Sequence, residues 1–424
     1  MTRRAILFVA DGHRDDFLRP ELCPNLAGFA DAGRRFHNHT GNFPSATRAS
    51  AASIATGCWP GTHGLHGNTM GLPSGRGTVI HDVGAPAFVE SLRSVFVRTL
   101  KARTLAERLA PHGGSLIASN VSPGAAYFQD PDGHGHVVHR AGSFGPGRRP
   151  LAPDEAPVVS HDAAGDMALC EWFCDRMIDD DDDGPALGVL WLSDPDLSMH
   201  ADALGSARHL AGIAAADACF GKLRDTVDAM RETGDDVLLI ACSDHGQETV
   251  IGHVAIGDEL VAAGLKDGPE STEVAVAPQG GSGLIYLAGD GVERLDKITA
   301  FLDAHPFVGE VFVGAAMRAV GQAEGNGLAI AFSMTNDTQK NENGVSGRIW
   351  VCTSDSKPGK PVGRGSHGGL GRWERHPFLI AGGGDFAPGT HENGRTRLID
   401  SAPTILRHFG QPRDGMDGLA LPLD

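Results

Sequence analysis

Short runs of apolar residues alternate with segments of helical periodicity along most of the chain. The apolar runs predict buried strands at Ala5–Ala10, Ser115–Ala118, Leu187–Leu192, Val237–Ala241 and Phe378–Ala381. Each run is followed by a polar or glycine-rich turn, and a strand covered on both faces is apolar along its whole length. The pattern therefore predicts an α/β fold with a mainly parallel sheet between helices.

The clearest helical pattern covers residues 206–233. It begins at Ser206, places apolar side chains at helical spacing from Leu210 to Met230, and ends before Gly234. Serine at the start and glycine just past the end are the ordinary boundaries of a helix. A second pattern, Asp400–Phe409, predicts a last helix.

Two stretches interrupt the alternation. Asn120–Pro150 is rich in glycine and histidine and predicts a long loop. Residues 249–361 carry a self-contained set of elements, namely strands Leu284–Leu287, Val311–Val313 and Arg348–Cys352 and helix Val292–Ala304. We therefore expect a smaller α+β cap at 249–361, inserted into a core made of residues 1–248 and 362–424.

Composition is that of a globular protein that does not enter a membrane. Of 424 residues, 41% are hydrophobic and 21% are charged. The apolar runs reach only about half a dozen residues, whereas a membrane-spanning helix needs roughly 20. The apolar stretch near the start is followed by charged residues instead of a signal-peptide cleavage site, so we expect a cytoplasmic protein.

The net charge of −17 argues against nucleic acid polymers and anionic membranes as partners, because a negative surface repels both. An anionic substrate would need local positive charge, for which bound metal cations are the obvious source. The seven cysteines are scattered and odd in number, which does not predict a disulfide framework. Cys170 and Cys174 are expected as buried helix residues rather than zinc ligands, and Asp179–Asp183 as a solvated loop rather than a calcium site.

Acidic and histidine residues gather beside the predicted strand ends, where open α/β sheets place their ligands. Asp11 follows the first strand, Asp244 and His245 follow another, and His367 precedes the last. Asp196 and His200 lie four residues apart, on one side of a helical turn, and can share one metal ion. Each pair is common by chance, and Asp11 alone could equally cap a helix. Their repetition beside strand ends predicts a metal centre.

Thr47 precedes the small, mostly apolar stretch Arg48–Thr56, which predicts a helix with Thr47 at its N-terminus. Free N–H groups and the helix dipole favour negative charge there, including an ionised hydroxyl or a phosphate. From this segment alone, a threonine that merely caps the helix is the better interpretation.

Taken together, these residues give the chain its likeness to a known family. It resembles the alkaline phosphatase superfamily, in particular the nucleotide pyrophosphatase/phosphodiesterase branch, which also contains phosphonoacetate hydrolase. The matching pieces span nearly the whole chain in the family's order: Asp11-Gly12, Pro24-Asn25-Leu26, Pro44-Ser45-Ala46-Thr47, Thr56-Gly57, His63-Gly64 with Asn68, Pro195-Asp196 to His200, Ser243-Asp244-His245-Gly246, His367-Gly368, Asp400 to Leu406, and Met416-Asp417-Gly418.

The resemblance implies two zinc ions and a threonine nucleophile. One ion would be held by Asp196, His200 and His367, and the other by Asp11, Thr47, Asp244 and His245. Thr47 matches the nucleophile, nine residues before Thr56, where sulfatases carry the cysteine that becomes formylglycine. Asn68 matches the asparagine whose amide donates to a phosphoryl oxygen. The implied reaction is hydrolysis of a phosphoester through a phospho-threonine intermediate.

For several histidines and for Arg48, the sequence is compatible with either a structural or a functional role. His63 and His66 flank the Asn68 turn and either pack in the core or touch substrate. The histidines of the glycine-rich segment, His134, His136 and His139, fit a flexible polar loop better than a third metal site or a lid. Arg48 either binds phosphate or makes an outward ion pair.

The substrate is expected to be a small-molecule phosphoester or phosphonate. Between Asn68 and Asp196 the only lysine is Lys101, which lies in a segment with a helical pattern. The same stretch contains Tyr127, Phe128 and Phe144, which could form an apolar wall of the substrate pocket. A phosphodiester or nucleotide-type substrate is therefore favoured over phosphonoacetate, and a monoester is disfavoured because no third metal site is evident. Phosphonoacetate hydrolase, a metal-dependent phosphomutase and an inactive ligand-binding protein on the same fold remain alternatives. A homodimer also remains open.

Overall fold

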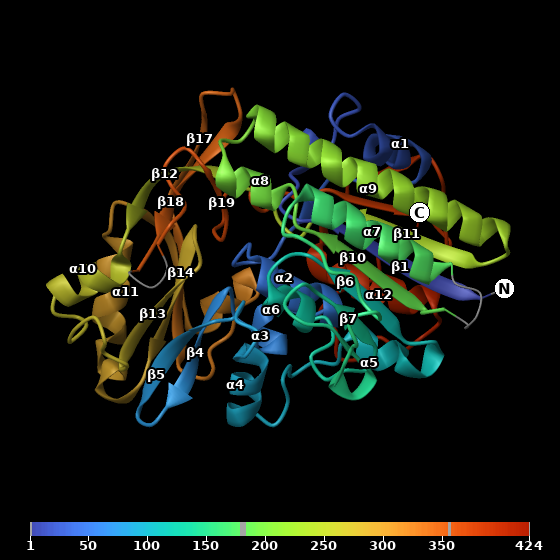
Figure 1. Ribbon diagram of the computed structural model, residues 1–424. Coiled ribbons are helices and arrows are strands. Elements are labelled where there is room, and N and C mark those ends of the chain that lie inside the picture. Colours follow the sequence, from blue (N-terminus) through green and yellow to red (C-terminus); the bar gives the residue numbers. More distant parts are fainter. Residues whose placement is uncertain (1, 179–183, 355–357, 424) are drawn as a thin grey trace.

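The computed structural model describes residues 2–178, 184–354 and 358–423. The acidic run Asp179–Asp183 thus lies outside the described residues. Figure 1 shows a large sheet with helices on the right and smaller sheets on the left, with α2 (Thr47–Thr56) between them.

The central sheet is mainly parallel, as predicted. Its strands are β1 (Arg3–Ala10), β2 (Arg34–Phe36), β6 (Ser115–Ser119), β7 (His136–Val138), β8 (Phe144–Gly145), β9 (Arg149–Pro150), β10 (Leu187–Leu192), β11 (Asp236–Cys242), β20 (Leu379–Gly382) and β21 (Thr390–Glu392). They lie in the order β21-β2-β20-β11-β1-β10-β6-β7-β8-β9. The run from β11 to β7 is parallel, and β20 is antiparallel to β11.

Strand β1 explains why the sheet is covered on both faces. Leu7 and Val9 belong to one apolar cluster, whereas Ile6 and Phe8 belong to another, because successive side chains of a strand point to opposite faces. One cluster includes residues of α2, α4 (Phe88–Val95), α5 (Leu105–Leu109), α6 (Pro123–Tyr127) and α12 (Ser401–His408). The other includes residues of α1 (Pro24–Ala32), α7 (Ala163–Met177) and α9 (Ala207–Glu232), which lie together above the sheet in Figure 1.

The two helices predicted from the pattern are confirmed. Helix α9 begins after Ser206, whose side chain accepts a hydrogen bond from the backbone N–H of His209, and ends just before Gly234. Helix α12 is shorter than predicted, because Leu398–Asp400 forms a separate 3-10 turn. Within the described residues, no helix is long and apolar enough to cross a membrane.

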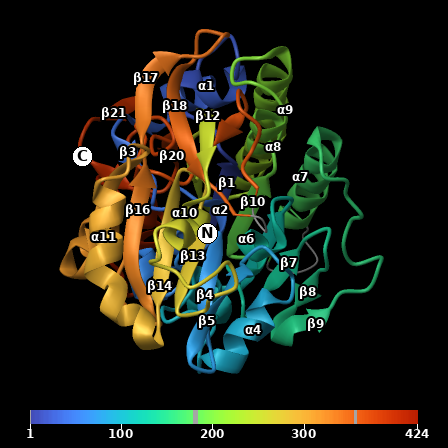
Figure 2. The same ribbon diagram turned by 90° about the vertical axis from the view of Figure 1, so that its left-hand side faces the viewer.

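The smaller sheets occupy the other side of the molecule (Figure 2). One contains β12 (Glu248–Val254), β17 (Asn336–Lys340), β18 (Ser346–Cys352) and β19 (Gly365–Ser366), and the other β13 (Val274–Pro278), β14 (Ser282–Leu287), β15 (Val308–Val313) and β16 (Leu328–Met334). Two-stranded ribbons pair β3 (His39–Thr40) with β22 (Thr396–Arg397) and β4 (Thr69–Ser74) with β5 (Gly77–Asp82). The remaining helices are α3 (Pro60–His63), α8 (Asp196–Ala201), α10 (Ile256–Ala262) and α11 (Leu295–Asp303).

The elements expected within 249–361 are present. The three predicted strands lie in β14, β15 and β18, while the predicted helix 292–304 is divided into a 3-10 turn, Gly289–Arg294, and α11. The β4–β5 hairpin, which precedes this region in the chain, packs against β13. The boundaries of a cap at 249 and 361 stay a prediction.

The prediction of a long loop over Asn120–Pro150 is wrong. The segment contains α6 and the strands β7, β8 and β9, which extend the central sheet. Strand β7 has only two adjacent apolar residues, Val137 and Val138, too few for a pattern. Parallel pairing with β6, which sets Val137 beside Ile117, makes it a strand.

The expected apolar substrate wall is also absent. Tyr127, Phe128 and Phe144 are buried, with at most 6% of their surface exposed, in the cluster beneath the sheet. Lys101 is not helical and lies between α4 and α5. The residues on which the preference for a diester was based therefore do not form the substrate pocket.

Candidate metal centre

The predicted metal ligands converge because of the strand order. Strand β1 lies between β10 and β11, so the residues that follow these three parallel strands meet at one edge of the sheet. Asp11 follows β1, Asp196 begins α8 shortly after β10, and Asp244 and His245 follow β11. His367 joins them from the turn after β19.

One group surrounds His245. Its Nε2 lies 3.2 Å from Oδ2 of Asp244 and 3.5 Å from Oδ1 of Asp11. The hydroxyl Oγ1 of Thr47 lies 3.0 Å from the same nitrogen. One ligand atom from each of Asp11, Asp244 and His245 falls within 4.8 Å of the others, so these three residues could hold one metal ion.

The second group surrounds Asp196. Its Oδ1 lies 3.4 Å from Nε2 of His200 and 3.8 Å from Nε2 of His367. The rings of His245 and His367 stack with centroids 3.8 Å apart, and Asp196, His245 and His367 also have ligand atoms within 4.8 Å. The two groups therefore share His245, and His200 joins the second one through Asp196.

All three histidines present Nε2 to this space for the same reason. The Nδ1 atoms of His200, His245 and His367 lie 2.8, 3.0 and 2.5 Å from the backbone carbonyls of Gly365, Gly246 and Ser45. A carbonyl accepts only from a protonated nitrogen, so Nδ1 carries the hydrogen and Nε2 keeps its lone pair. This arrangement is typical of metal-binding histidines.

The carboxylates provide a test of whether these residues fit a metal ion. Oδ1 of Asp11 and Oδ2 of Asp244 are buried and have no hydrogen-bond partner among the described residues. Burial, and then the charges of Asp244 and Asp196, raise the pKa of Asp11 well above its usual value. Buried carboxylates that lack partners are costly unless a cation balances them. The donor set therefore fits a divalent metal ion.

Thr47 and Asn68 lie beside this space, both 8% exposed. Thr47 is the first residue of α2, as predicted. Oδ1 of Asn68 accepts from the backbone N–H of Arg48 at 3.0 Å, which leaves the amide hydrogens of Asn68 to donate elsewhere. The position of Asn68 depends on Gln279, whose Oε1 accepts from the Asn68 backbone N–H at 2.6 Å.

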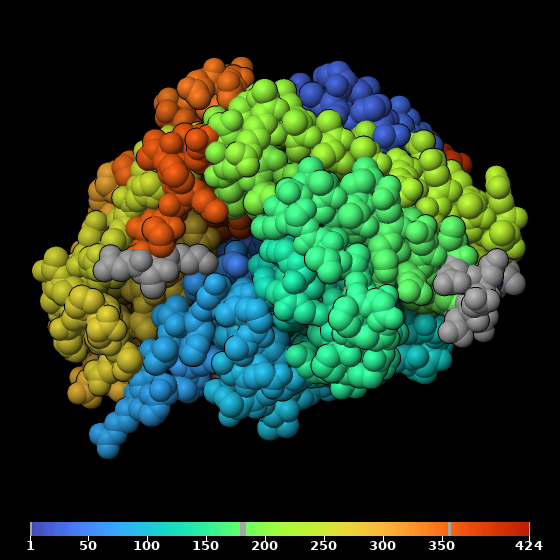
Figure 3. Space-filling model, in the orientation of Figure 1, coloured from blue at the N-terminus to red at the C-terminus, as the bar shows by residue number. Residues whose placement is uncertain are grey.

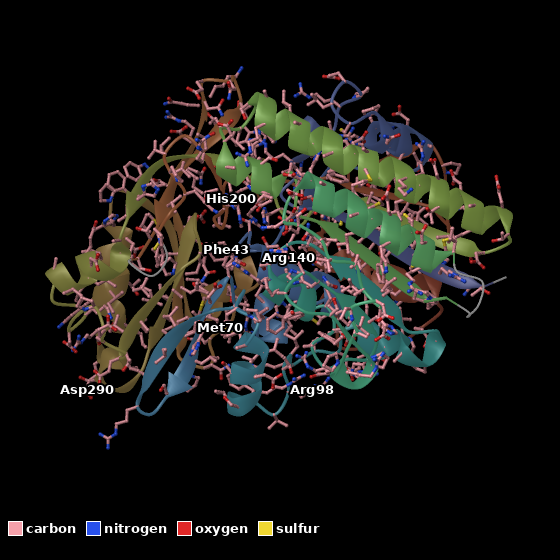
Figure 4. The ribbon with its side chains drawn as sticks, viewed as in Figure 1. Phe43, Met70, Arg98, Arg140, His200 and Asp290 are labelled. Carbon is pink, nitrogen blue, oxygen red and sulfur yellow. The ribbon has the colours of Figure 1, made fainter. Side chains whose placement is uncertain are left out.

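These residues open into a cavity of about 580 Å³. It is lined by Asp11, Thr47, Arg48, Asn68, Asp82, Arg140, His161, Asp196, His200, Gln279, Gly280, Val351, Cys352, Lys360 and His367, among others. Residues 279–280, 351–352 and 358–360 come from the region expected as a cap, so that region borders the metal groups. Figure 3 shows the hollow in this face, and Figure 4 shows His200 and Arg140 near its centre.

Sequence reasoning missed the residues that hold the ligands in place. The indole Nε1 of Trp191 donates to Oδ2 of Asp11 at 2.9 Å, and Nε2 of Gln247 donates to Oδ1 of Asp196. Glu374, fully buried, accepts from the Ser45 hydroxyl at 2.9 Å and thereby supports the carbonyl that faces His367. No local sequence pattern indicates that a tryptophan or a glutamine will donate a hydrogen bond to a candidate metal ligand.

Arg48 faces the cavity rather than the outer surface. Its Nε donates to the Ser122 hydroxyl at 3.0 Å, and its Nη2 lies 3.8 Å from Asp82. Burial lowers the pKa of Arg48, while the charges of Asp82, Asp11 and Asp196 oppose that effect. The guanidinium therefore adds positive charge beside Thr47.

The remaining histidines do not enter the metal groups. His63 and His66 are buried against Ser53 and Tyr286, and neither lines the cavity. His139 is buried with Nε2 at 3.0 Å from the Val121 carbonyl, while His134 and His136 line a separate cavity of about 720 Å³. Within the described ranges, the two groups above are the only sets of three His, Cys, Asp or Glu side chains placed to share an ion. Cys170 and Cys174 are buried in α7, as expected.

Comparison with a protein-family model shows to which family the chain belongs. The model described as type I phosphodiesterase / nucleotide pyrophosphatase matches residues 5–296. The chain belongs to this family. The range matched to the phosphodiesterase family contains every proposed ligand except His367, which the fold supplies from beyond it.

Solved structures agree with the fold. Murine ectonucleotide pyrophosphatase/phosphodiesterase 5 aligns with 100% of this phosphodiesterase-family chain and 97% of its own, at 16% identity and a TM-score of 0.66. An inactive variant of that protein in complex with AMP gives the same values. This likeness shows that the chain shares the mixed α/β fold of these structures, with its large, mainly parallel central sheet. No curated protein sequence matches the chain.

Proposed function

We propose that the protein is a zinc-dependent phosphoesterase of the phosphodiesterase/nucleotide pyrophosphatase type, acting on small molecules through Thr47. The observation that carries this proposal is the position of Oγ1 of Thr47. It lies 3.0 Å from Nε2 of His245, and the same nitrogen lies 3.5 and 3.2 Å from the buried oxygens of Asp11 and Asp244 that accept no hydrogen bond. The AMP complex of the murine structural relative supports a nucleotide-type substrate.

Two zinc ions fit the donor set. Asp196, His200 and His367 would hold one, and Asp11, Thr47, Asp244 and His245 the other, since imidazole and carboxylate are ordinary zinc ligands. When bound, such a pair stabilises the negative charge of an attacking hydroxyl and of a leaving oxygen. His245 belongs to both candidate groups of ligand atoms.

The residues of the chain then perform a two-step displacement. Oγ1 of Thr47 forms a bond to phosphorus as the bond to the substrate alcohol breaks, and the alcohol leaves with a proton. Water next attacks the phospho-threonine, restoring the Thr47 hydroxyl and releasing the phosphoryl group. The Asn68 amide, the N-terminal N–H groups of α2 and the Arg48 guanidinium are placed to hold the non-bridging oxygens.

Phosphonoacetate hydrolysis is the second candidate, and a specific observation favours it. Arg140 and Lys360 line the same cavity as Thr47. They supply fixed positive charge that the sequence analysis did not find, because it considered only the lysine between Asn68 and Asp196. Hydrolysis of a carbon–phosphorus bond would use the same threonine and metal groups.

Turnover of a substrate panel by zinc-loaded protein tests the proposal. The panel contains a 4-nitrophenyl phosphodiester, a monoester, a sulfate ester, a nucleotide diester and phosphonoacetate. We expect diester cleavage that chelator abolishes and that Thr47→Ala reduces by about a thousandfold or more. Thr62→Ala, at an exposed threonine, serves as the matched control.

Two outcomes would contradict the proposal. Near-normal turnover by Thr47→Ala would remove Thr47 as nucleophile. Absence of turnover on every substrate, with zinc bound, would instead identify a binding protein that has kept the fold. Faster cleavage of phosphonoacetate than of any diester would select the second candidate.

A further inference from the structure

The cavity contains a guanidinium that the proposed reaction does not use. Arg140 follows β7 and is only partly buried, and its side chain borders the same space as Thr47 and His200. In Figure 4, Arg140 and His200 lie near the centre of the hollowed face and come from different elements. The wall that carries Arg140 is the segment that the sequence presented as a loop.

A buried network fixes the position of Arg140. Its Nη1 donates to the backbone carbonyl and, at 3.0 Å, to the side-chain oxygen of Asn120, which is fully buried. The Asn120 amide donates to Asp166 at 2.9 Å, and Asp166 in turn accepts from the backbone N–H of Ser193 at 3.0 Å. Arg140 is therefore tied to the turn that leads into Asp196.

The free side of this guanidinium has no acceptor. Its hydrogen bonds all use Nη1, and none of the described residues accepts from Nε or Nη2 or forms an ion pair with Arg140. Burial lowers the pKa of Arg140, while the charge of Asp166 opposes that effect without a direct ion pair. In a chain of net charge −17, an unpaired cation on a cavity wall calls for an anionic ligand.

Two further basic side chains line the same cavity. His161 and Lys360 are both exposed, and each contributes to the cavity wall. His161 interacts electrostatically with Arg140 and with Asp196, and Lys360 interacts with His200 and His367. The three basic groups thus border the outer part of the cavity.

Arg140 and Arg48 are held at different places on the cavity wall. Arg48 follows Thr47 in α2 and contacts Ser122 and Asp82, whereas Arg140 is held by Asn120. The phosphoryl group that reacts at Thr47 is therefore within reach of Arg48. Arg140 is thus a second cationic group in the same cavity, available to another part of the substrate.

We propose that Arg140, assisted by His161 and Lys360, forms a subsite for a second anionic group carried by a substituent of the phosphoester. The substrate class is thus a phosphate ester or phosphonate that also bears a carboxylate or a further phosphate. This inference rests on the proposed function, since it assigns the reacting phosphoryl group to Thr47. A guanidinium suits the role because its planar fork binds either oxyanion through two parallel hydrogen bonds.

Three matched esters test the subsite with zinc-loaded protein. All release 4-nitrophenol from a phosphodiester, and the second alcohol carries an ethyl, a 2-carboxyethyl or a 2-phosphonoethyl group. We expect kcat/KM to be about ten- to a hundredfold higher for at least one anionic ester than for the ethyl ester, the ratio expected for a charge-assisted hydrogen bond. Comparison of the two anionic esters distinguishes carboxylate from phosphate.

Variants of Arg140 give the decisive comparison. Arg140→Gln should bring the ratio of anionic to ethyl ester close to one, and Arg140→Lys should restore part of it. Arg76→Gln, at an exposed arginine on the β4–β5 turn, is the control and should leave the ratio unchanged. Equal losses for all three esters in Arg140→Gln would show that Arg140 holds the reacting phosphoryl group, which would overturn the subsite.

A binding measurement separates the subsite from catalysis. Calorimetry compares 3-phosphonopropionate with propylphosphonate, which lacks the carboxylate, on zinc-loaded wild type and Arg140→Gln. Tighter binding of 3-phosphonopropionate by the wild type alone supports the subsite even if no ester is cleaved, in which case only the proposed function fails. Ester cleavage without any preference for anionic substituents, together with equal binding of the two phosphonates, overturns the subsite and leaves the proposed function standing.

Discussion

The indole Nε1 of Trp191 donates a hydrogen bond of 2.9 Å to Oδ2 of Asp11. The parallel pairing of β1 with β10 makes this contact, because it sets Val9 beside Trp191 and brings the indole next to the residue that follows the strand. With Oδ2 occupied, Oδ1 of Asp11 is left to face His245 at 3.5 Å. The indole therefore orients a carboxylate that we propose as a metal ligand.

Trp191→Phe should weaken metal binding while the fold remains. Loss of the indole N–H leaves a buried carboxylate oxygen without a donor, which costs about 1–3 kcal/mol of stability. Loss of a partner to a metal ligand typically lowers metal affinity by about 10–100-fold. Zinc titration and urea unfolding measure the two effects, and Trp172→Phe, on the half-buried face of α7, is the control. Unchanged zinc affinity in Trp191→Phe would mean that Asp11 needs no orientation.

Removal of metal should lower the melting temperature, and more so as pH rises. Without a cation, burial and the charges of Asp244 and Asp196 raise the pKa of Asp11. The folded state then binds a proton that the unfolded chain releases, so the stability of the metal-free protein falls as pH increases. Metal at about a thousand times its dissociation constant should add about 4 kcal/mol. Calorimetric melting with and without chelator, from about pH 5 to 8, gives the comparison. A chelator-independent melting temperature would argue against the metal centre.

Glu248 predicts a second pH dependence. This side chain is fully buried, Oε2 has no partner, and burial together with the charge of Glu374 raises the pKa of Glu248 to about 8. In the unfolded chain the group titrates at its usual value, near 4.5. Between these values the folded state holds the extra proton, so its contribution to stability declines as pH rises through the window.

Glu248→Gln should therefore flatten the decline in stability between about pH 5 and 8. Urea unfolding midpoints at several pH values measure the slope. Glu293→Gln, at an exposed glutamate, should leave the slope as in the wild type. An equally steep decline in Glu248→Gln would assign the effect to other groups.

A side chain at position 84 should displace the guanidinium of Arg48. A Cβ at residue 84 would clash with Nη2 of Arg48 and lie 2.9 Å from its Nε, at the flexible end of that side chain. Gly84→Ala should displace the guanidinium from Ser122 and reduce kcat/KM by about tenfold, while stability changes by about 0.5 kcal/mol. Gly268→Ala, where a Cβ meets nothing within 4 Å, is the control.

A double-mutant cycle checks the cause of that loss. If Gly84→Ala acts through Arg48, it should have no further effect on kcat/KM in an Arg48→Gln background. Additive losses in the double variant would show that Gly84 affects the cavity in another way.

The sequence by itself determined the core of the sheet and the residues that meet at its edge. The five predicted strands lie in β1, β6, β10, β11 and β20, because strands buried on both faces must be continuously apolar. Asp11, Asp196, Asp244 and His245 could be proposed as a group because parallel strands end at one edge and each residue lies just past a strand. Local sequence is enough to predict that residues lie close together when each of them directly follows a strand of the same parallel sheet.

Only the tertiary structure decided which other side chains enter the cavity. Trp191, Gln279 and Arg140 act through partners far away in the chain, and no local spacing records such contacts. The same limit explains the wrong prediction of a loop over 120–150, because β7 forms by pairing with β6. Tyr127, Phe128 and Phe144 pack inward against residues from distant parts of the chain. Substrate recognition therefore depends on contacts between distant segments, which folding creates and composition does not encode.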